Sequence, residues 1–334
     1  MRKTRLIQVG MGPIGIQTAK MAYMRDDIDL VGGIDVNPEI VGKDIGLLFG
    51  NAVIGKNVES DIKKACKKWD PDVAVLTTVS QVSKLELVAI ELLNSGLHVV
   101  SSSEELLVPK LRTPEIAKNL DRTAKKNGVT MVAAGVNPGF TMDLLPLFVT
   151  TLCIEVNKIS VYRCLDASFR RGSLQKKVGA GLTVEDFRRG EREGWIGHKG
   201  LQESIRLLAQ GLEWKDIEIS ETLNPIIAEH DFETDFFEIK KGSVAGVHHV
   251  GHGKKDDQVL IEHDLKMSVG AEESFDLVQI LGTPDLELKF KGGIPGDIAT
   301  SATLLNTVSR AIEASPGLLT PLDLSLLRGV GRVL

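Results

Sequence analysis

The strongest constraint on the fold lies in the first 35 residues. A short apolar run at residues 6–9 leads directly into Gly10-Met11-Gly12-Pro13-Ile14-Gly15, and a helix-like segment at 16–24 and a second apolar run ending at Asp35 follow. Gly10 permits a tight turn, Gly12 lets the backbone approach a pyrophosphate, and Gly15 lets the helix pack on the strand. The helix start would hold phosphates through its N–H groups and its dipole. This order of elements predicts a dinucleotide-binding unit of the Rossmann type.

The alternation of strands and helices continues to about residue 140. Apolar, strand-like runs occur at 73–78, 98–101 and 129–134, and helical spacing occurs at 83–95 and 113–126. Gly96 and Gly128 stand where a helix C-terminal glycine belongs. Short connections between alternating strands and helices predict a doubly wound parallel sheet.

The pattern then changes. Strand-like runs at 157–164, 217–223, 232–240, 259–269 and 286–290 lack regular helices between them, apart from two inserted helices at 184–191 and 201–212. A long helix is expected at 297–314. The fold class predicted is α/β, with a Rossmann domain at 1–143 and an α+β domain for substrate binding and dimerisation at 144–295, built on a mostly antiparallel sheet. Residues 296–334 are expected to pack back toward the Rossmann domain, and substrate is expected between the two domains.

Composition narrows the classes of partner. The net charge is −5 over 334 residues, which favours neither nucleic acid nor an anionic membrane surface. Three cysteines without paired spacing indicate a reducing compartment. Neither a signal pattern nor an apolar run of about 18 residues is present, so we expect a cytoplasmic protein. His248, His249 and His252 lie in a glycine-rich stretch, interpreted as a loop without a suitable acid or cysteine nearby, and no metal ion is expected.

Cofactor contacts follow from the ends of the predicted strands. A carboxylate at Asp35 can accept both ribose hydroxyls and would repel a 2′-phosphate, which favours NAD, while Lys43 nearby leaves NADP open. Ligands of such sheets sit outside the carboxyl ends of the strands. The residues predicted to bind the cofactor are Gly10, Met11, Gly12, Pro13, Ile14, Gly15, Asp35, Thr77, Thr78, Ser101 and Asn137.

Two acids, Glu104 and Glu105, follow the strand at 98–101 and are the best candidates for chemistry. A carboxylate in an apolar cleft has a raised proton affinity unless a cation neutralises it, and an ammonium or iminium substrate would be that cation. The same group could exchange protons as a general acid or base. The alternative is that both acids only begin the helix that follows, where acids are favoured.

The sequence also resembles a known family. Gly10–Gly15, Ser-Ser-Ser-Glu-Glu-Leu at 101–106 and Gly-Val-Asn-Pro-Gly-Phe-Thr-Met-Asp at 135–143 are similar to the 2,4-diaminopentanoate dehydrogenases and the related native amine dehydrogenases, in the dihydrodipicolinate-reductase-like group. The likeness continues at 166–171, 174–181, 197–204 and 292–300. It implies NAD(P)-dependent reductive amination of a ketone or aldehyde with ammonia, and the reverse oxidative deamination. By this resemblance Glu104, the first acid of its motif, is the catalytic residue.

The resemblance also implies a substrate pocket, for which the candidates are Phe140, Arg163, Ser168, Phe169 and His198. Two departures from the family pattern are Cys164-Leu165, where a glutamine is expected, and Lys199, where an apolar residue usually follows the loop histidine.

Three other functions stay open on the sequence. A sugar or cyclitol dehydrogenase of the Gfo/Idh/MocA type would carry Glu-Lys-Pro at this edge, whereas this chain has Glu104-Glu105-Leu106. A reductase of preformed imines, like dihydrodipicolinate reductase, would act without ammonia. An NAD-binding regulator would bind the cofactor without catalysis. A homodimer is expected, since the sheet of the second domain needs a covered face.

Overall fold

The computed structural model describes residues 2–331 of the chain, which form two compact units. The first unit joins both ends of the sequence, Met1–Phe140 and Pro295–Leu334, and the second is the continuous segment Thr141–Ile294. Each unit has its own sheet and its own buried apolar clusters.

The first unit is built on a seven-stranded sheet in the order β15-β6-β5-β4-β1-β2-β3, with every pair parallel. The order runs outward from β1 and β4 in opposite directions, so the topological switch point lies between these two strands. The strands are β1 (Thr4–Val9), β2 (Ile28–Ile34), β3 (Val58–Glu59), β4 (Val73–Leu76), β5 (His98–Ser101), β6 (Thr130–Ala133) and β15 (Gly317–Leu319).

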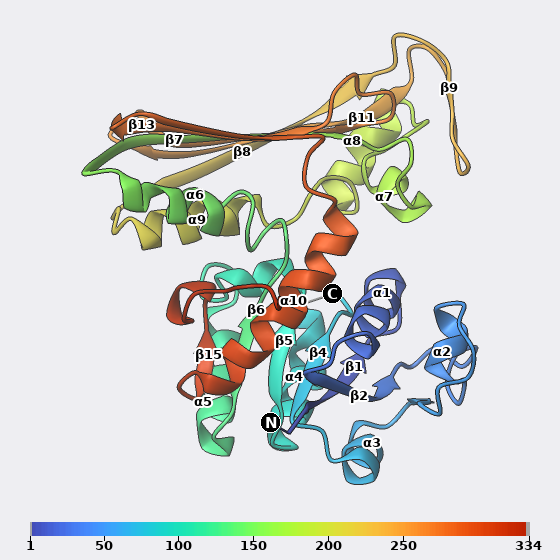
Figure 1. Ribbon diagram of the computed structural model, residues 1–334. Helices are drawn as coiled ribbons and strands as arrows, with labels where there is room; N and C mark the ends of the chain where they lie inside the picture. Colours follow the sequence, from blue (N-terminus) through green and yellow to red (C-terminus); the bar gives the residue numbers. More distant parts are fainter. Residues whose placement is uncertain (1, 332–334) are drawn as a thin grey trace. The chain divides into compact units, whose positions relative to one another are not determined.

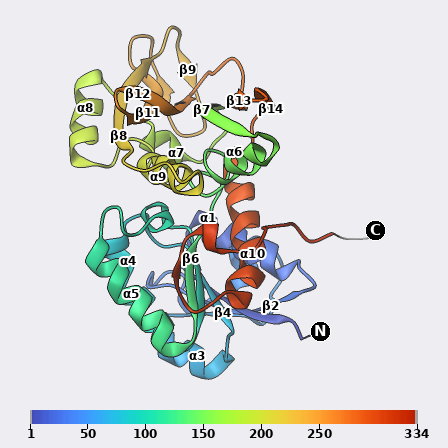
Figure 2. The same ribbon diagram turned by 90° about the vertical axis from the view of Figure 1, so that its left-hand side faces the viewer.

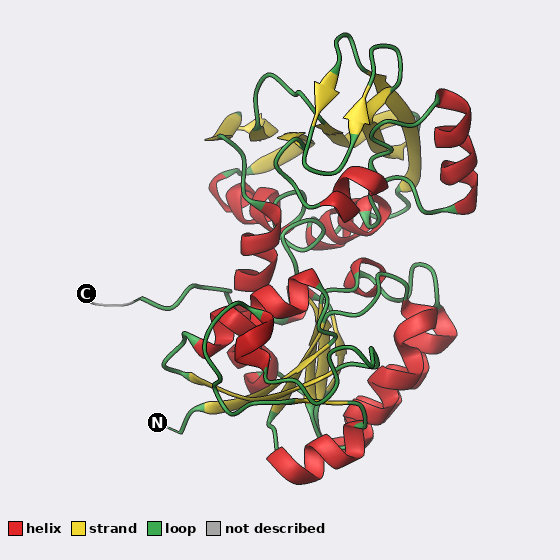
Figure 3. Cartoon of the chain, turned by 90° about the vertical axis from the view of Figure 1, so that its right-hand side faces the viewer, coloured by secondary structure: helices red, strands yellow, loops and turns green. Residues whose placement is uncertain are grey.

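Helices cover both faces of this sheet, and all four residues of β4 are therefore buried. Figures 2 and 3 show helices on either side of the sheet. Figure 2 labels α4 and α5 on one face and α10, which packs against α1, on the other. The longer helices are α1 (Pro13–Tyr23), α3 (Ile62–Trp69), α4 (Val82–Asn94), α5 (Pro114–Asn127) and α10 (Gly296–Glu313), and the short ones are α2 (Ile45–Leu48), η1 (Glu104–Leu107) and η3 (Pro321–Asp323).

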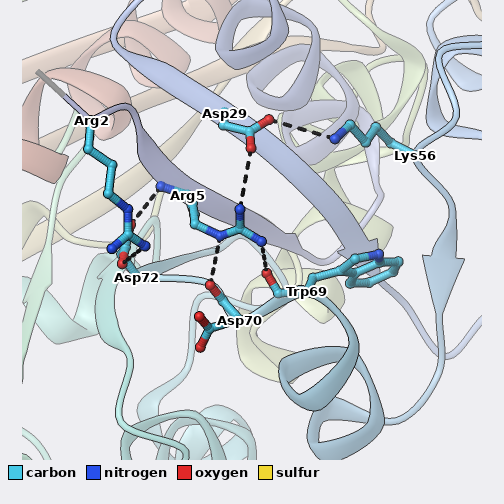
Figure 4. Close-up of polar contacts among 7 residues, drawn as sticks. All are labelled: Arg2, Arg5, Asp29, Lys56, Trp69, Asp70 and Asp72. Carbon is cyan, nitrogen blue, oxygen red and sulfur yellow. Dashed lines mark hydrogen bonds and ion pairs between the residues drawn. The ribbon is translucent and has the colours of Figure 1, made fainter.

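Arg5 holds the end of α3 against the amino-terminal edge of this sheet (Figure 4). Its Nε donates a hydrogen bond to the Asp70 carbonyl at 2.9 Å, and Nη2 donates another to the Trp69 carbonyl. A cation at the carbonyl end of a helix is favourable. The Trp69 ring covers β2 at Gly32, where a Cβ atom would lie 2.4 Å from the ring. This structural cluster lies at the edge opposite the carboxyl ends of the strands.

The second unit contains a six-stranded sheet in the order β14-β13-β7-β12-β11-β8 (Figure 1). Only the β7–β12 pair is parallel, so the sheet is mixed with mostly antiparallel pairs. The strands are β7 (Glu155–Asp166), β8 (Glu218–Ile227), β11 (Val244–Lys255), β12 (Gln258–Ser268), β13 (Phe275–Thr283) and β14 (Leu286–Lys291). A small separate hairpin consists of β9 (Phe232–Glu233) and β10 (Glu238–Ile239).

Helices α6 (Leu144–Val149) and α9 (Leu201–Gly211) lie together on one face of the six-stranded sheet (Figure 1). Leu201 and Ile205 of α9 pack on Ile159 and Ile261 of the central strands. Helix α8 (Val184–Glu193) contributes Phe187 to a second buried cluster, and α7 (Gly172–Lys177) ends next to Val178, another member of that cluster. The short helix η2 (Thr150–Leu152) follows α6. Within residues 2–331, no helix packs on the opposite face of this sheet.

The sequence-based interpretation of the second unit was wrong in three respects. The stretch with His248, His249 and His252 is the middle of β11 and not a loop, and β13 was not predicted. Residues 232–240 form two short strands instead of one. The glycines of β11 have a packing reason, since a Cβ at Gly251 would lie 2.8 Å from Ile205 Cδ1 of α9.

No helix in the described part of the chain is long and apolar enough to cross a membrane.

Candidate active site

The glycine turn lies at the carboxyl end of β1, next to the switch point. Gly10 has a φ of +85°, and a Cβ there would lie 2.8 Å from the carbonyl oxygen of Thr77, which follows β4. A Cβ at Gly15 would lie only 1.9 Å from the Gly10 carbonyl oxygen. Both positions therefore need glycine for the turn itself, as the sequence pattern predicts.

Gly12 differs from its neighbours because a Cβ there would meet no atom within 4 Å. It is the N-cap residue of α1, where it has no side chain to bond the first N–H groups of the helix, and Pro13 follows at the first helical position. The first turn of α1 thus offers backbone N–H groups and the positive end of the helix dipole beside open space. These residues fit the pyrophosphate of a dinucleotide, which they would hold through backbone N–H groups of α1.

Asp35 directly follows β2, and its carboxylate bonds to the glycine turn. Its Oδ2 accepts a hydrogen bond from the Met11 N–H at 2.6 Å, and its Oδ1 accepts one from the Asn37 N–H at 2.8 Å. A carboxylate has about four lone-pair sites, so both oxygens can still accept bonds from ribose hydroxyls. The carboxylate therefore both orders the glycine turn and fits the predicted ribose contact.

The other predicted cofactor residues lie at the carboxyl ends of neighbouring strands. The Thr77 hydroxyl donates to the Gly10 carbonyl at 3.0 Å, which ties the end of β4 to the glycine turn. Thr78 is exposed, and the hydroxyl of buried Ser101 donates to the Leu76 carbonyl at 3.2 Å. Asn137 is half-buried in the turn after β6. All of them belong to the first unit.

Glu104 and Glu105 begin η1 two residues after the end of β5, and their surroundings differ. Glu105 Oε2 accepts a hydrogen bond from the Val82 N–H, the first residue of α4, at 3.0 Å. Its backbone N–H donates to the Ser80 carbonyl at 3.3 Å. Glu104 is half-buried at the same edge. The carboxylate of Glu105 thus serves a helix that precedes it in the chain, a contact that the sequence did not predict.

Arg163 lies in β7 within the second unit and is only 2% exposed. Its Nη1 forms an ion pair with Asp276 Oδ1 at 2.5 Å and a hydrogen bond to Thr141 Oγ1 at 3.1 Å, and its Nη2 donates to the Ile294 carbonyl at 2.8 Å. Burial raises the pKa of the Asp276 carboxyl, and the guanidinium of Arg163 opposes that shift. These contacts give Arg163 a structural role, and its predicted contact with substrate stays a prediction.

The other predicted pocket residues have distinct surroundings. The Ser168 hydroxyl donates to Asp166 Oδ1 at 2.6 Å and accepts from the Gly270 N–H at 2.9 Å, so it stabilises the turn after β7. Phe169 is 95% exposed. His198 lies half-buried between α8 and α9, and Phe140 is half-buried at the last residue before the second unit.

The histidines of β11 do have acidic neighbours, contrary to the sequence-based interpretation. His248 Nε2 lies 3.0 Å from Asp264 Oδ1, and His249 Nε2 lies 3.2 Å from Glu221 Oε2. Adjacent strand residues point to opposite faces of a sheet, so the two pairs do not converge. Among residues 2–331, no group of three or more potential ligands could hold a metal ion.

Comparison with known proteins places these features in a family. Residues 140–332 match the model of the 2,4-diaminopentanoate dehydrogenase C-terminal domain. The 2,4-diaminopentanoate dehydrogenase of Acetoanaerobium sticklandii is 31% identical over 99% of this chain and 96% of its own length. The chain belongs to the 2,4-diaminopentanoate dehydrogenase family.

More distant relatives agree with this assignment. An amine dehydrogenase of Streptomyces virginiae is 23% identical, with 97% of both chains covered. The solved amine dehydrogenase of Mycobacterium smegmatis shares the fold with a TM-score of 0.87, at 22% identity over 98% of this chain and 97% of that one. The chain is thus an NAD(P)-dependent oxidoreductase of the amine dehydrogenase class, and the predicted family, fold class, enzyme class and nicotinamide cofactor are confirmed.

Proposed function

We propose that the chain interconverts a primary amine and the matching ketone or aldehyde, with Glu104 as the residue that handles the amine nitrogen and its protons. One observation carries this proposal. Glu104 begins η1 two residues after the end of β5, at the carboxyl edge of the sheet that also holds the glycine turn. Ligands of doubly wound sheets bind at this edge.

The overall oxidation converts a primary ammonium compound, water and NAD(P)+ into a carbonyl compound, an ammonium ion, NAD(P)H and a proton. Bound NAD(P) supplies the acceptor and donor of hydride. The Glu104 carboxylate binds the ammonium group, accepts a proton from it, and helps water to add to the oxidised carbon. In the reverse direction the same carboxylate holds ammonium, releases ammonia for attack on the carbonyl carbon, and assists the loss of water.

Asp35 supports a preference for NAD over NADP. Its carboxylate is fixed by the Met11 N–H within the glycine turn, so its negative charge stays where a 2′-phosphate would have to bind. The ratio of kcat/KM for NAD to that for NADP measures the preference. Asp35→Asn keeps an oxygen that can accept from Met11 and removes the charge, so the ratio should fall in this variant. An unchanged ratio would assign the preference to other residues.

For the substrate, we propose a small amine such as 2,4-diaminopentanoate, whose dehydrogenase is the relative at 31% identity. Phe169 and His198 are proposed to contact it. A panel of amines and amino acids, scored by NAD(P)H formation, tests the substrate class. In the reductive direction, NADH consumption must require added ammonia. NADH consumption without ammonia would instead support reduction of a preformed imine, or reduction of the ketone itself to an alcohol.

We also propose that the protein is a homodimer in a reducing compartment, the cytoplasm. The three free thiols of Cys66, Cys153 and Cys164 support the compartment. The dimer is supported by the face of the six-stranded sheet that no helix in the described part of the chain covers. Val250 and Tyr162 are half-buried on that face. The face carries both charge signs, including the Lys158–Glu262 pair, and is therefore compatible with a self-complementary two-fold contact.

A further inference from the structure

The segment that carries Glu104 is tied to the loop between β4 and α4. The Ser103 hydroxyl donates a hydrogen bond to the Ser80 carbonyl at 2.6 Å, and the Glu105 N–H donates to the same carbonyl at 3.3 Å. Ser103 is only 1% exposed. A carbonyl that accepts two hydrogen bonds from one short segment fixes that segment firmly.

The carboxylate of Glu105 adds a third tie to the same loop. Its Oε2 accepts the Val82 N–H at 3.0 Å, and Val82 is fully buried at the start of α4. The N-cap residue of α4, Gln81, makes no side-chain cap hydrogen bond, so Glu105 supplies an acceptor at this helix start from 23 residues away. A negative charge at a helix N-terminus is also favoured by the helix dipole.

We propose that Glu105 is a positioning residue for Glu104, an inference that rests on the proposed function of Glu104. Glu104 stands between Ser103 and Glu105, which are bonded to Ser80 in the loop and to Val82 at the start of α4, so its backbone cannot shift without breaking those bonds. That loop begins at Thr77, whose hydroxyl bonds to the Gly10 carbonyl in the glycine turn. Glu105 therefore couples the position of the acid to the position of the turn that holds the cofactor.

The test compares substitutions that keep or remove the acceptor at position 105. Glu105→Gln keeps an oxygen that can accept the Val82 N–H, so we expect kcat within about threefold of the wild type. Glu105→Ala removes the acceptor, and we expect kcat to fall by about tenfold to a hundredfold, because small misplacements of reacting groups are costly. Glu105→Asp keeps the charge but shortens the reach, and its kcat should lie between the two. If the Glu105→Ala variant does not fold, Glu105→Asp provides the test of the same contact.

A purely structural role of Glu105 would leave the acid–base behaviour of folded enzyme unchanged. The test is the pH profile of kcat/KM for the amine, measured well below the melting temperature of each variant. The limb of the profile that reports the titration of the catalytic acid should be displaced in Glu105→Ala but not in Glu105→Gln. Glu115→Ala is the matched control, because it removes an exposed acid from the first turn of α5. It should leave kcat and the profile unchanged.

Two results would overturn the inference: wild-type kcat and an unmoved pH profile in folded Glu105→Ala, or equal damage in Glu105→Gln and Glu105→Ala. Failure of the proposed function looks different. If Glu104→Gln retained amination while Glu105→Gln lost it, Glu105 would be the acid and the roles of the two residues would be exchanged.

Discussion

Gly12 and Gly15 belong to one turn, yet they are glycines for different physical reasons. A Cβ at Gly15 would overlap the Gly10 carbonyl oxygen at 1.9 Å, so the fold itself requires glycine there. A Cβ at Gly12 would meet nothing within 4 Å, so the fold does not require glycine at that position. We therefore predict that glycine at this position serves a ligand that approaches the backbone.

Alanine substitutions separate the two reasons. We expect Gly12→Ala to keep the wild-type melting temperature but to weaken NADH binding by at least about tenfold, since the methyl group projects toward the pyrophosphate. Gly15→Ala should lower the melting temperature as well, because overpacking typically costs about 1–3 kcal/mol. Thermal unfolding and fluorescence titration with NADH measure both effects. Unchanged NADH affinity in Gly12→Ala would argue against a cofactor at this turn.

The residues that the sequence predicts well are those whose role is local. The glycine turn and Asp35 form one βαβ unit, in which a fixed order of elements sets the geometry. The contact of Glu105 with Val82 and the ion pair of Arg163 with Asp276 were not predictable, since the partners lie 23 and 113 residues apart and no local pattern marks them.

Strand β11 shows at the scale of an element why the second unit was harder to predict. Its glycines and histidines are typical of a loop. In the folded chain, however, Gly246 and Gly251 allow atoms of other elements to approach the strand closely, and these atoms are distant in the sequence. A Cβ at Gly246 would lie 2.1 Å from the Met267 backbone carbonyl oxygen, whereas one at Gly251 would meet the flexible end of Ile205 at 2.8 Å. Tertiary packing therefore overrides the local preference.

This difference predicts unequal costs for two substitutions in the same strand. Gly246→Ala should lower the free energy of unfolding by about 3 kcal/mol, because backbone cannot move aside easily. Gly251→Ala should cost about 1 kcal/mol, because side-chain ends can rotate away. Urea unfolding of both variants measures the difference. Equal and small costs would contradict the packing described for β11.

His263, in the adjacent strand β12, predicts a pH dependence of stability. Burial lowers its pKa to about 3, although the nearby Met142 backbone opposes the shift. In the unfolded chain the pKa is about 6.5, so the unfolded state binds the proton more readily between these values. Its contribution to stability is complete above pH 6.5 and is lost as the pH falls toward 3, with a slope of up to about 1.4 kcal/mol per pH unit.

The measurement is urea unfolding between pH 7.5 and 4.5 for the wild type and His263→Leu. The variant should lose less stability on acidification than the wild type does. His230→Gln, a change at an exposed histidine, is the control and should follow the wild type. If His263→Leu showed the wild-type pH dependence, the buried imidazole would not be the group responsible.

At the scale of the whole molecule, the chain divides into a discontinuous first unit and a continuous second one. The alternation of strands and helices makes the first unit predictable, because parallel strands need helical crossovers.

The second unit supplies the sheet face proposed to form the dimer. Val250→Lys on this face should shift the protein toward the monomer in sedimentation experiments. Leu87→Lys, at an exposed apolar residue of α4, is the control. A wild-type mass for Val250→Lys would contradict this interface.

The central claim, that Glu104 handles the amine nitrogen, is tested most directly by Glu104→Gln. The measurement is ammonia-dependent oxidation of NADH with the best carbonyl substrate, together with the Kd for NADH. We predict that amination falls by at least about a hundredfold, the loss expected for a general acid–base group, while the Kd for NADH changes by less than about threefold. Wild-type rates of amination in Glu104→Gln would contradict the account.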